Sequence, residues 1–115
     1  MNVVVLTIFN AVLMAIGQML WKHGMTGAEI HGVVDILRAM LNPFVLLGFT
    51  IYAGTTLLWL YILNKAEISY VYPIQSLVFV FVLIASIFIF HESVGINRFV
   101  GVGLIIVGVI ISSLK

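Results

Sequence analysis

The sequence predicts an all-α membrane protein with four transmembrane helices and an amphipathic interfacial helix between the first two. Hydrophobic residues make up 63% of the 115 residues and charged residues only 8%, whereas soluble domains carry about 25% charged residues. The five basic and four acidic residues also leave four long stretches without charge. Because a helix of about 20 apolar residues crosses a bilayer core, most of the chain is expected to face lipid.

The uncharged stretches place the spans near residues 2–21, 43–63, 69–90 and 95–114. Each span is expected to be helical, because unpaired backbone polar groups are costly in hydrocarbon and the runs lack the alternation of barrel strands. The last span qualifies if Arg98 extends its charge to the interface. Residues 1–115 are thus expected to form a single transmembrane domain, multi-pass in a bacterial or archaeal plasma membrane.

Several classes of protein are excluded by what the sequence lacks. It contains no cysteine, which excludes disulfides and thiolate metal sites. No HExxH motif, nucleophile elbow or glycine-rich phosphate loop occurs, and the three histidines are scattered. We therefore expect neither an enzyme nor a metal or other cofactor. A net charge of +1 indicates no nucleic-acid partner, and no basic residue precedes the first span, as a signal peptide would require.

The connection between the first two spans is too long for a helical hairpin. Thr26 and Glu29 match the S/T-x-x-E capping box, and apolar residues then recur at helical spacing. This pattern predicts the interfacial helix over about residues 27–41. Asn42-Pro43 should end it, with Pro43 in the first turn of the next span. The other connections are short, so the last three spans should be antiparallel neighbours.

Basic residues are almost evenly divided between the two membrane faces. One face carries Lys22, Arg38 and Arg98, and the face of both termini carries Lys65 and Lys115. An excess of Lys and Arg normally marks the cytoplasmic side. The balance leaves two interpretations open: a weak orientation signal in a small protein, or insertion in both orientations, as an antiparallel dimer requires.

The spans contain neutral polar groups but no acidic or basic residue near their middle, although an intramembrane carboxylate is the usual marker of proton or cation coupling. Asn10 and Gln18, eight residues apart, lie roughly on one helix face. They either bond neighbouring helices together or line a hydrophilic groove. Our candidate substrate-binding residues are Gln18, Lys22, Trp59, Tyr72, Gln75, Ser76 and Glu92.

Pro73, Lys22 and Glu92 can each be explained by helix structure alone as well as by function. Pro73 promotes a bend if it lies inside the third helix, as at many transporter binding sites, but it is harmless in a first turn. Lys22 and Glu92 lie at helix ends on one membrane face and form either a charged vestibule or independent end groups. An interfacial anchor explains Lys22, and a first-turn carboxylate explains Glu92.

The last span carries small residues that allow close helix contact. Gly101 and Gly108 are seven residues apart and share a face with Leu104 and Ile105. Packing within the monomer is one interpretation. Dimerisation is the other, because this span has no polar residue between Phe99 and Ile111 to face a cavity and four helices do not easily surround one. We expect a dimer of eight helices with these four residues at its interface.

Together, these motifs resemble a known superfamily. They are Gly17-Gln18-x-x-x-Lys22, Tyr72-Pro73-x-x-Ser76-Leu77, His91-Glu92 and the segment 101–109. The pattern is similar over the whole length to four-helix members of the drug/metabolite transporter superfamily, the first connection being least typical. Two families within it are candidates: the small multidrug resistance exporters, and the EamA-like subunits that resemble the flippase of aminoarabinose-linked undecaprenyl phosphate.

Met14 separates the two families. Small multidrug resistance proteins carry their essential carboxylate three residues before the glycine that corresponds to Gly17, where this chain has Met14. Without that carboxylate, their exchange of protons for cationic drugs does not carry over. The Gly-Gln, Tyr-Pro-x-x-Ser-Leu and His-Glu segments instead resemble the EamA-like flippase subunits.

The resemblance implies a flippase subunit or transporter that moves an amphiphilic, lipid-linked sugar by alternating access. Its partners would be membrane lipids, the substrate, and either a second copy, antiparallel or not, or a paralogue. The neutral candidates would suit sugar hydroxyls, and Lys22 would meet the lipid phosphate. Two alternatives stay open: a multidrug-type exporter of small organic cations, coupled through Glu92, and a non-transporting scaffold subunit.

Overall fold

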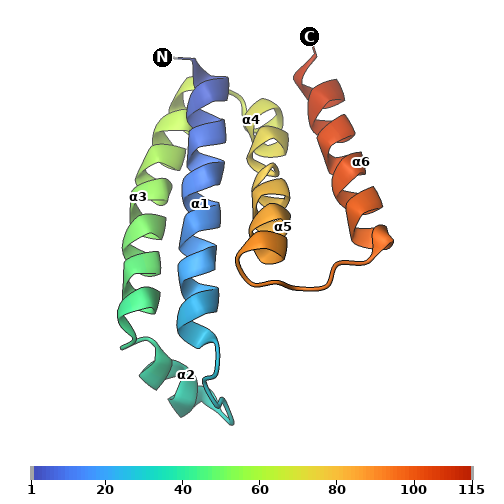
Figure 1. Ribbon diagram of the computed structural model, residues 1–115. Coiled ribbons are helices and arrows are strands. Elements are labelled where there is room, and N and C mark those ends of the chain that lie inside the picture. The colour runs from blue at the N-terminus through green and yellow to red at the C-terminus, as the bar shows by residue number, and fades with distance from the viewer. Residues whose placement is uncertain (1, 115) are drawn as a thin grey trace.

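The computed structural model describes residues 2–114 and consists of six helices joined by short connections (Figure 1). They are α1 Val3–Met25, α2 Val33–Ala39, α3 Pro43–Lys65, α4 Ile68–Gln75, α5 Val78–Phe88 and α6 Ile96–Ser113. Four segments are long and apolar enough to cross a membrane: α1, α3, α4 with α5, and α6. The predicted all-α architecture with four membrane-crossing segments is confirmed. Lys115, counted above on one membrane face, lies outside the described residues.

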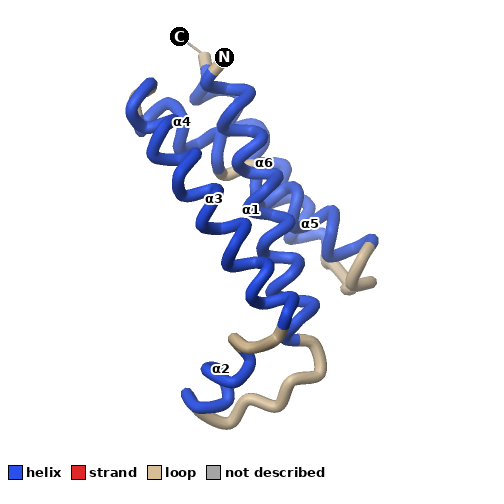
Figure 2. Tube along the Cα trace, turned by 90° about the vertical axis from the view of Figure 1, so that its left-hand side faces the viewer, coloured by secondary structure: helices blue, strands red, loops and turns tan. Residues whose placement is uncertain are grey.

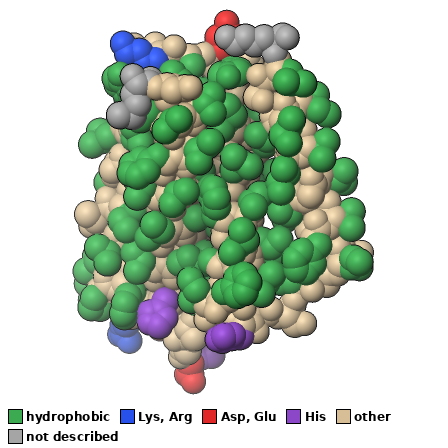
Figure 3. All heavy atoms as spheres, turned by 45° about the horizontal axis from the view of Figure 1, so that its top comes forward, with side chains coloured by type: hydrophobic (Ala, Val, Ile, Leu, Met, Phe, Trp, Pro, Cys, Tyr) green, Lys and Arg blue, Asp and Glu red, His purple; other side chains and the backbone are tan. Residues whose placement is uncertain are grey.

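The ends of the bundle are polar and its middle is apolar. The start of α1 and the end of α6 lie at one end of the bundle, while α2 and the α5–α6 connection lie toward the other (Figures 1 and 2). Charged and histidine side chains gather at these two ends, and a broad hydrophobic band separates them (Figure 3). This distribution aligns the long helices with the membrane normal.

Asparagine caps begin the first two spans. The Asn2 side chain accepts a hydrogen bond from Val4 N at 2.8 Å, and Asn42 Oδ1 accepts one from Phe44 N at 2.9 Å. These bonds satisfy backbone donors that have no partner within a helix. Asn42 Nδ2 also donates to Gly24 O at 3.3 Å, which ties the start of α3 to the end of α1. Pro43 occupies the first turn of α3, as predicted.

The helix between the first two spans is shorter than predicted. It is α2, which covers seven residues instead of the expected 27–41. The predicted capping box is wrong, because Thr26 ends α1 and donates its hydroxyl to Lys22 O at 2.7 Å. Gly27 then turns the chain with a φ of 82°, a conformation that glycine adopts without steric cost. Glu29 is left exposed before α2 begins.

The third span is divided by a two-residue turn at Ser76-Leu77. Pro73 lies inside α4 instead of in its first turn, so it withholds a backbone donor from the helix. Ser76 N then bonds to the carbonyls of both Tyr72 and Pro73, at 3.2 and 3.1 Å. The bond to Pro73 joins residues three apart, as in a 3₁₀ turn, and such bonds tighten a helix locally. The tight turn marks the point where α4 ends and α5 begins.

The tightest packing joins α1 to α3, and α6 is the most loosely packed span. A Cβ at Gly48 would lie 2.6 Å from the Trp21 indole and 3.0 Å from the Gly17 carbonyl, so glycine is what permits this close approach. In α6 only Val109 is buried. That helix rests mainly against α4 and slants away from α5 toward the α5–α6 connection (Figure 1).

Candidate functional site

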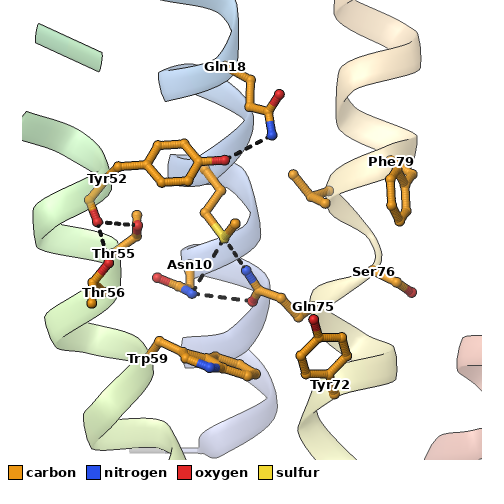
Figure 4. A pocket seen from close by; sticks show the side chains of 12 residues that line it. Asn10, Gln18, Tyr52, Thr55, Thr56, Trp59, Tyr72, Gln75, Ser76 and Phe79 are labelled. Carbon is orange, nitrogen blue, oxygen red and sulfur yellow. Dashed lines mark hydrogen bonds between the residues drawn. The ribbon is translucent and has the colours of Figure 1, made fainter. Parts of the chain in front are cut away.

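A cavity of about 370 Å³ lies between α1, α3 and the α4–α5 segment, about halfway along α1 (Figure 4). Its lining residues are Asn10, Met14, Gln18, Tyr52, Thr55, Thr56, Trp59, Tyr72, Gln75, Ser76, Val78 and Phe79. They supply amides, hydroxyls, aromatic rings and one thioether. Within the described chain, no acidic, basic or histidine side chain belongs to this wall.

The deepest polar group of the cavity is an amide pair. Asn10 Nδ2 donates to Gln75 Oε1 at 3.3 Å, and Gln75 Nε2 contacts the Met14 sulfur. Asn10 is 1% exposed, yet its Oδ1 has no hydrogen-bond partner among the described residues. Figure 4 shows this oxygen pointing away from Gln75, toward α3. An unpaired buried acceptor is costly, and a donor on a bound molecule would satisfy it.

A second pair lies toward the α2 end of the cavity. Gln18 Nε2 donates to the Tyr52 hydroxyl at 2.8 Å. The Tyr52 ring stacks on Trp21 with a centroid separation of 4.4 Å, and Trp21 Nε1 donates to Val45 O at 3.1 Å. This chain of contacts fixes the Tyr52 ring. Because its oxygen accepts from Gln18, the phenolic proton remains to donate.

The hydroxyls of the wall present acceptors more than donors. Thr55 and Thr56 both donate to Tyr52 O, at 2.8 and 2.9 Å, and Ser76 donates to Pro73 O. Each hydroxyl has one proton and two lone pairs, so these oxygens can still accept. The cavity therefore suits groups that carry N–H or O–H, and it offers no cation to an anion.

An aromatic pair lies toward the α4 end of the cavity. The Trp59 and Tyr72 rings meet edge to face with centroids 5.9 Å apart, and Tyr72 is 61% exposed. Such faces bind the apolar side of a sugar ring or an ammonium group.

The cavity brings together part of the predicted site. Gln18, Trp59, Tyr72, Gln75 and Ser76 line it. Lys22 does not; it is exposed in the last turn of α1. Glu92 lines a different cavity, between α5 and α6. Lys22 and Glu92 therefore share none of the cavities described for residues 2–114, which favours the alternative of independent end groups.

Other lining residues were not among the sequence candidates. For Asn10 the signal was present, since its spacing from Gln18 put both amides on one face. The only sequence signal for a cavity at Tyr52, Thr55 and Thr56 was that these side chains are polar. Phe79 carried no signal, because one phenylalanine among the apolar residues of a span has nothing to distinguish it.

Comparison with known proteins identifies the family. A model described as the EamA-like transporter family matches residues 1–114. The chain belongs to this family. Two relatives are each named "Probable 4-amino-4-deoxy-L-arabinose-phosphoundecaprenol flippase subunit ArnE". The one from Enterobacter sp. (strain 638) is 37% identical and covers 93% of this chain and 92% of its own length. The one from Aeromonas hydrophila is 30% identical and covers 83% and 82%.

No solved structure matches the chain. As an EamA-like transporter with four membrane-crossing segments, it is a multi-pass protein of the bacterial cell membrane. The expected resemblance to EamA-like flippase subunits is confirmed, since both relatives are named as probable flippase subunits.

Proposed function

We propose that this EamA-like transporter is a flippase subunit that moves the headgroup of a lipid-linked sugar through the cavity between α1, α3 and the α4–α5 segment. The observation that carries the proposal is the unpaired, buried Asn10 oxygen within a wall of neutral polar groups. A sugar hydroxyl or amine would donate to it. The relatives named above are named for an amino sugar joined through phosphate to a polyprenol, an amphiphile of this class.

The size and chemistry of the cavity support this assignment. Its volume of about 370 Å³ falls within the range of about 300–1,000 Å³ that small-molecule sites occupy. Hydroxyls and ammonium groups donate to its acceptors, while the Trp59 and Tyr72 rings offer apolar faces. The hydrocarbon tail would stay in the surrounding lipid, where it costs nothing to solvate.

The loose packing of α6 supports a dimer. Leu104 is 67% exposed and Gly108 is exposed, and a Cβ added at Gly101 or Gly108 would meet nothing within 4 Å. Leu104 and Gly108 are thus uncovered by the chain itself, while Gly101 and Ile105 line the cavity beside α5. We propose that α6 packs against a second four-helix chain, a copy or a paralogue, and that the pair alternates access between the two membrane sides.

Translocation by reconstituted protein tests the proposal. Liposomes containing the chain, with any chain that co-purifies, receive a fluorescent amino-sugar polyprenyl phosphate, and a membrane-impermeant quencher reports the fraction that crosses. We expect Gln18→Ala and Gln75→Leu to lower the rate at least about tenfold, a loss of about 1.4 kcal/mol. Thr50→Val is the matched control, since Thr50 is exposed on α3 and donates to Leu46 O of its own helix.

Two results would replace the proposal with an alternative. If wild-type protein forms a stable hetero-complex but moves no lipid, the chain is a non-transporting scaffold subunit. Wild-type protein that releases protons when a quaternary ammonium compound is added is a multidrug-type exporter. Unchanged rates in both cavity variants would remove the assignment of the site.

A further inference from the structure

A second cavity, of about 470 Å³, is lined by residues of α5, α6 and the connection between them. That connection lies toward the end of the bundle that carries α2 (Figure 1). Its lining residues are Phe79, Val82, Leu83, Ser86, Glu92, Arg98, Gly101, Val102 and Ile105. The charged members, Glu92 and Arg98, belong to the polar end of the bundle, and the apolar members continue along both helices toward Phe79. This cavity is therefore amphipathic, with a charged mouth and an apolar interior.

The two charges at the mouth are not paired with each other. Among the described residues, the ion pair within 4.0 Å is His31 with Glu29; neither Glu92 nor Arg98 forms one. Both side chains are exposed and free to meet a ligand. A carboxylate and a guanidinium that line one cavity without neutralising each other offer a binding place for one cation and one anion.

Backbone geometry fixes where Glu92 stands. Its N–H donates to Ser86 O at 2.9 Å, which folds the chain back onto the end of α5. His91 adopts a φ of 53° to make this turn, a left-handed conformation that favours glycine and costs a histidine some strain. Arg98 lies in the first turn of α6, where its N–H donates to Gly95 O at 3.1 Å. The segment that follows α5 and the start of α6 therefore contribute one charge each to the lining of the cavity.

We propose that this cavity binds the zwitterionic headgroup of a lipid that carries both a phosphate ester and a primary amine. Arg98 receives the phosphate, for which a guanidinium has matching donor geometry. Glu92 receives the ammonium, and the first hydrocarbon units lie along Val82, Leu83 and Val102. A purely anionic lipid binds less well, because it brings no ammonium group to pair with the Glu92 carboxylate.

The inference rests on the proposed function in one respect: it makes the second cavity the loading site for the first. The first cavity has acceptors and no cation, so it suits hydroxyls and amines but not a phosphate. The second supplies the missing guanidinium. Phe79 lines both cavities and is 57% exposed, so it is the shared wall that a headgroup passes. Lys22 was expected from the sequence to bind the lipid phosphate, but it lines neither cavity. Arg98 takes this phosphate-binding role instead.

Lipid binding to the purified chain, with any co-purifying partner, tests the inference. Native mass spectrometry measures binding of four probes: dioctanoyl phosphatidylethanolamine, its N-acetyl derivative, dioctanoyl phosphatidylglycerol, and a short-chain amino-sugar polyprenyl phosphate. We expect the two probes with a free amine to bind at least tenfold more tightly than the other two. Glu92→Gln should abolish this preference, and Arg98→Gln should weaken binding of all four at least tenfold. Lys22→Gln, a charge removed from the same bundle end, should change neither.

The two amine-bearing probes distinguish the source of the lipid. Tenfold tighter binding of the amino-sugar lipid supports a loading site for substrate, and equal binding supports a site for bilayer phospholipid of the same chemistry. Equal binding of all four probes, or an amine preference that survives Glu92→Gln, overturns the inference. So does a result in which the Glu92 and Arg98 variants dissociate a dimer without changing lipid binding, since a second chain then fills the cavity.

This inference and the proposed function fail separately. Gln75→Leu alters the first cavity alone, so it should lower the translocation rate about tenfold while the amine preference of binding persists. Selective binding without translocation by wild-type protein would contradict the flippase function and leave the lipid site standing. Translocation by wild-type protein with no headgroup preference in binding would contradict the lipid site and support the flippase function.

Discussion

Asn10 of α1 donates a 3.3 Å hydrogen bond to Gln75, the last residue of α4, across 65 positions of sequence. Gln75 is 8% exposed and directly precedes the Ser76-Leu77 turn that divides the third span. The bond therefore holds the turn against α1. It also leaves Asn10 Oδ1 unpaired in the cavity. Helix association and cavity formation, the two interpretations that the amides of α1 allowed, are combined in this one side chain.

Replacing Asn10 by leucine should affect transport far more than stability. Hydrogen bonds between membrane helices contribute about 0.6 kcal/mol on average and at most about 1.7 kcal/mol, so Asn10→Leu should destabilise the protein by no more than this. The variant also removes the buried acceptor, and the translocation rate should fall at least about tenfold. Thermal unfolding in detergent and the liposome assay measure the two effects.

Thr7→Val is the matched control for Asn10→Leu. Thr7 is buried one turn earlier on α1 and donates to Val3 O of its own helix at 2.8 Å, but it does not line the cavity. Transport should be kept in this variant. An Asn10→Leu protein that folds and transports normally would show that Asn10 serves the bundle alone. One that no longer folds would contradict the small stability loss expected here.

The parts of this fold that could be predicted are those set by residues close together in the sequence. The spans and the Asn42-Pro43 helix start are encoded locally, by uncharged length and by capping chemistry, and the structure has them. The start of α2 was mispredicted because Thr26 bonds backward to Lys22 instead of forward to Glu29, a choice between two local partners that spacing does not decide. Gln75 lines a cavity with α1 and α3, whereas Glu92 lines one with α6; these contacts join distant parts of the sequence, and no local pattern specifies them.

The glycines of α3 offer a sharp test of the α1–α3 contact. Gly48→Ala should destabilise the protein by about 1–3 kcal/mol, the usual cost of overpacking, because the new Cβ would lie 2.6 Å from the Trp21 ring and 3.0 Å from the Gly17 carbonyl. Gly54→Ala, on the same helix, meets nothing within 4 Å and should be neutral or slightly stabilising, since alanine favours helix. Unfolding temperatures of the two variants should differ in this order; equal values would contradict the packing described.

Introducing a carboxylate at Met14 should give the cavity a coupling group that it lacks. Met14 contacts Gln75 at the centre of the wall, and a glutamate there would bind either a proton or an organic cation. Met14→Glu protein should bind tetraphenylphosphonium above the pH at which the new carboxyl ionises and lose it as pH falls. Isothermal titration in detergent measures this binding. Wild type and Met14→Gln should show no such pH dependence; equal binding by Met14→Gln would mean that shape, and not charge, limits cation binding.

Cysteine cross-linking tests whether α6 forms the dimer interface, and the chain's lack of cysteine makes each introduced thiol unique. Leu104 lies near the middle of α6 and is 67% exposed, so Leu104→Cys should form a disulfide-linked dimer whether the two helices run parallel or antiparallel. Gly108→Cys mixed with Gly101→Cys distinguishes the two: only in an antiparallel pair do these positions approach within the roughly 4.4–6.8 Å between Cα atoms that a disulfide requires. Leu60→Cys on α3, 58% exposed, should stay monomeric. Dimers through Leu60→Cys but not Leu104→Cys would place the partner on α3 and free α6 to face lipid.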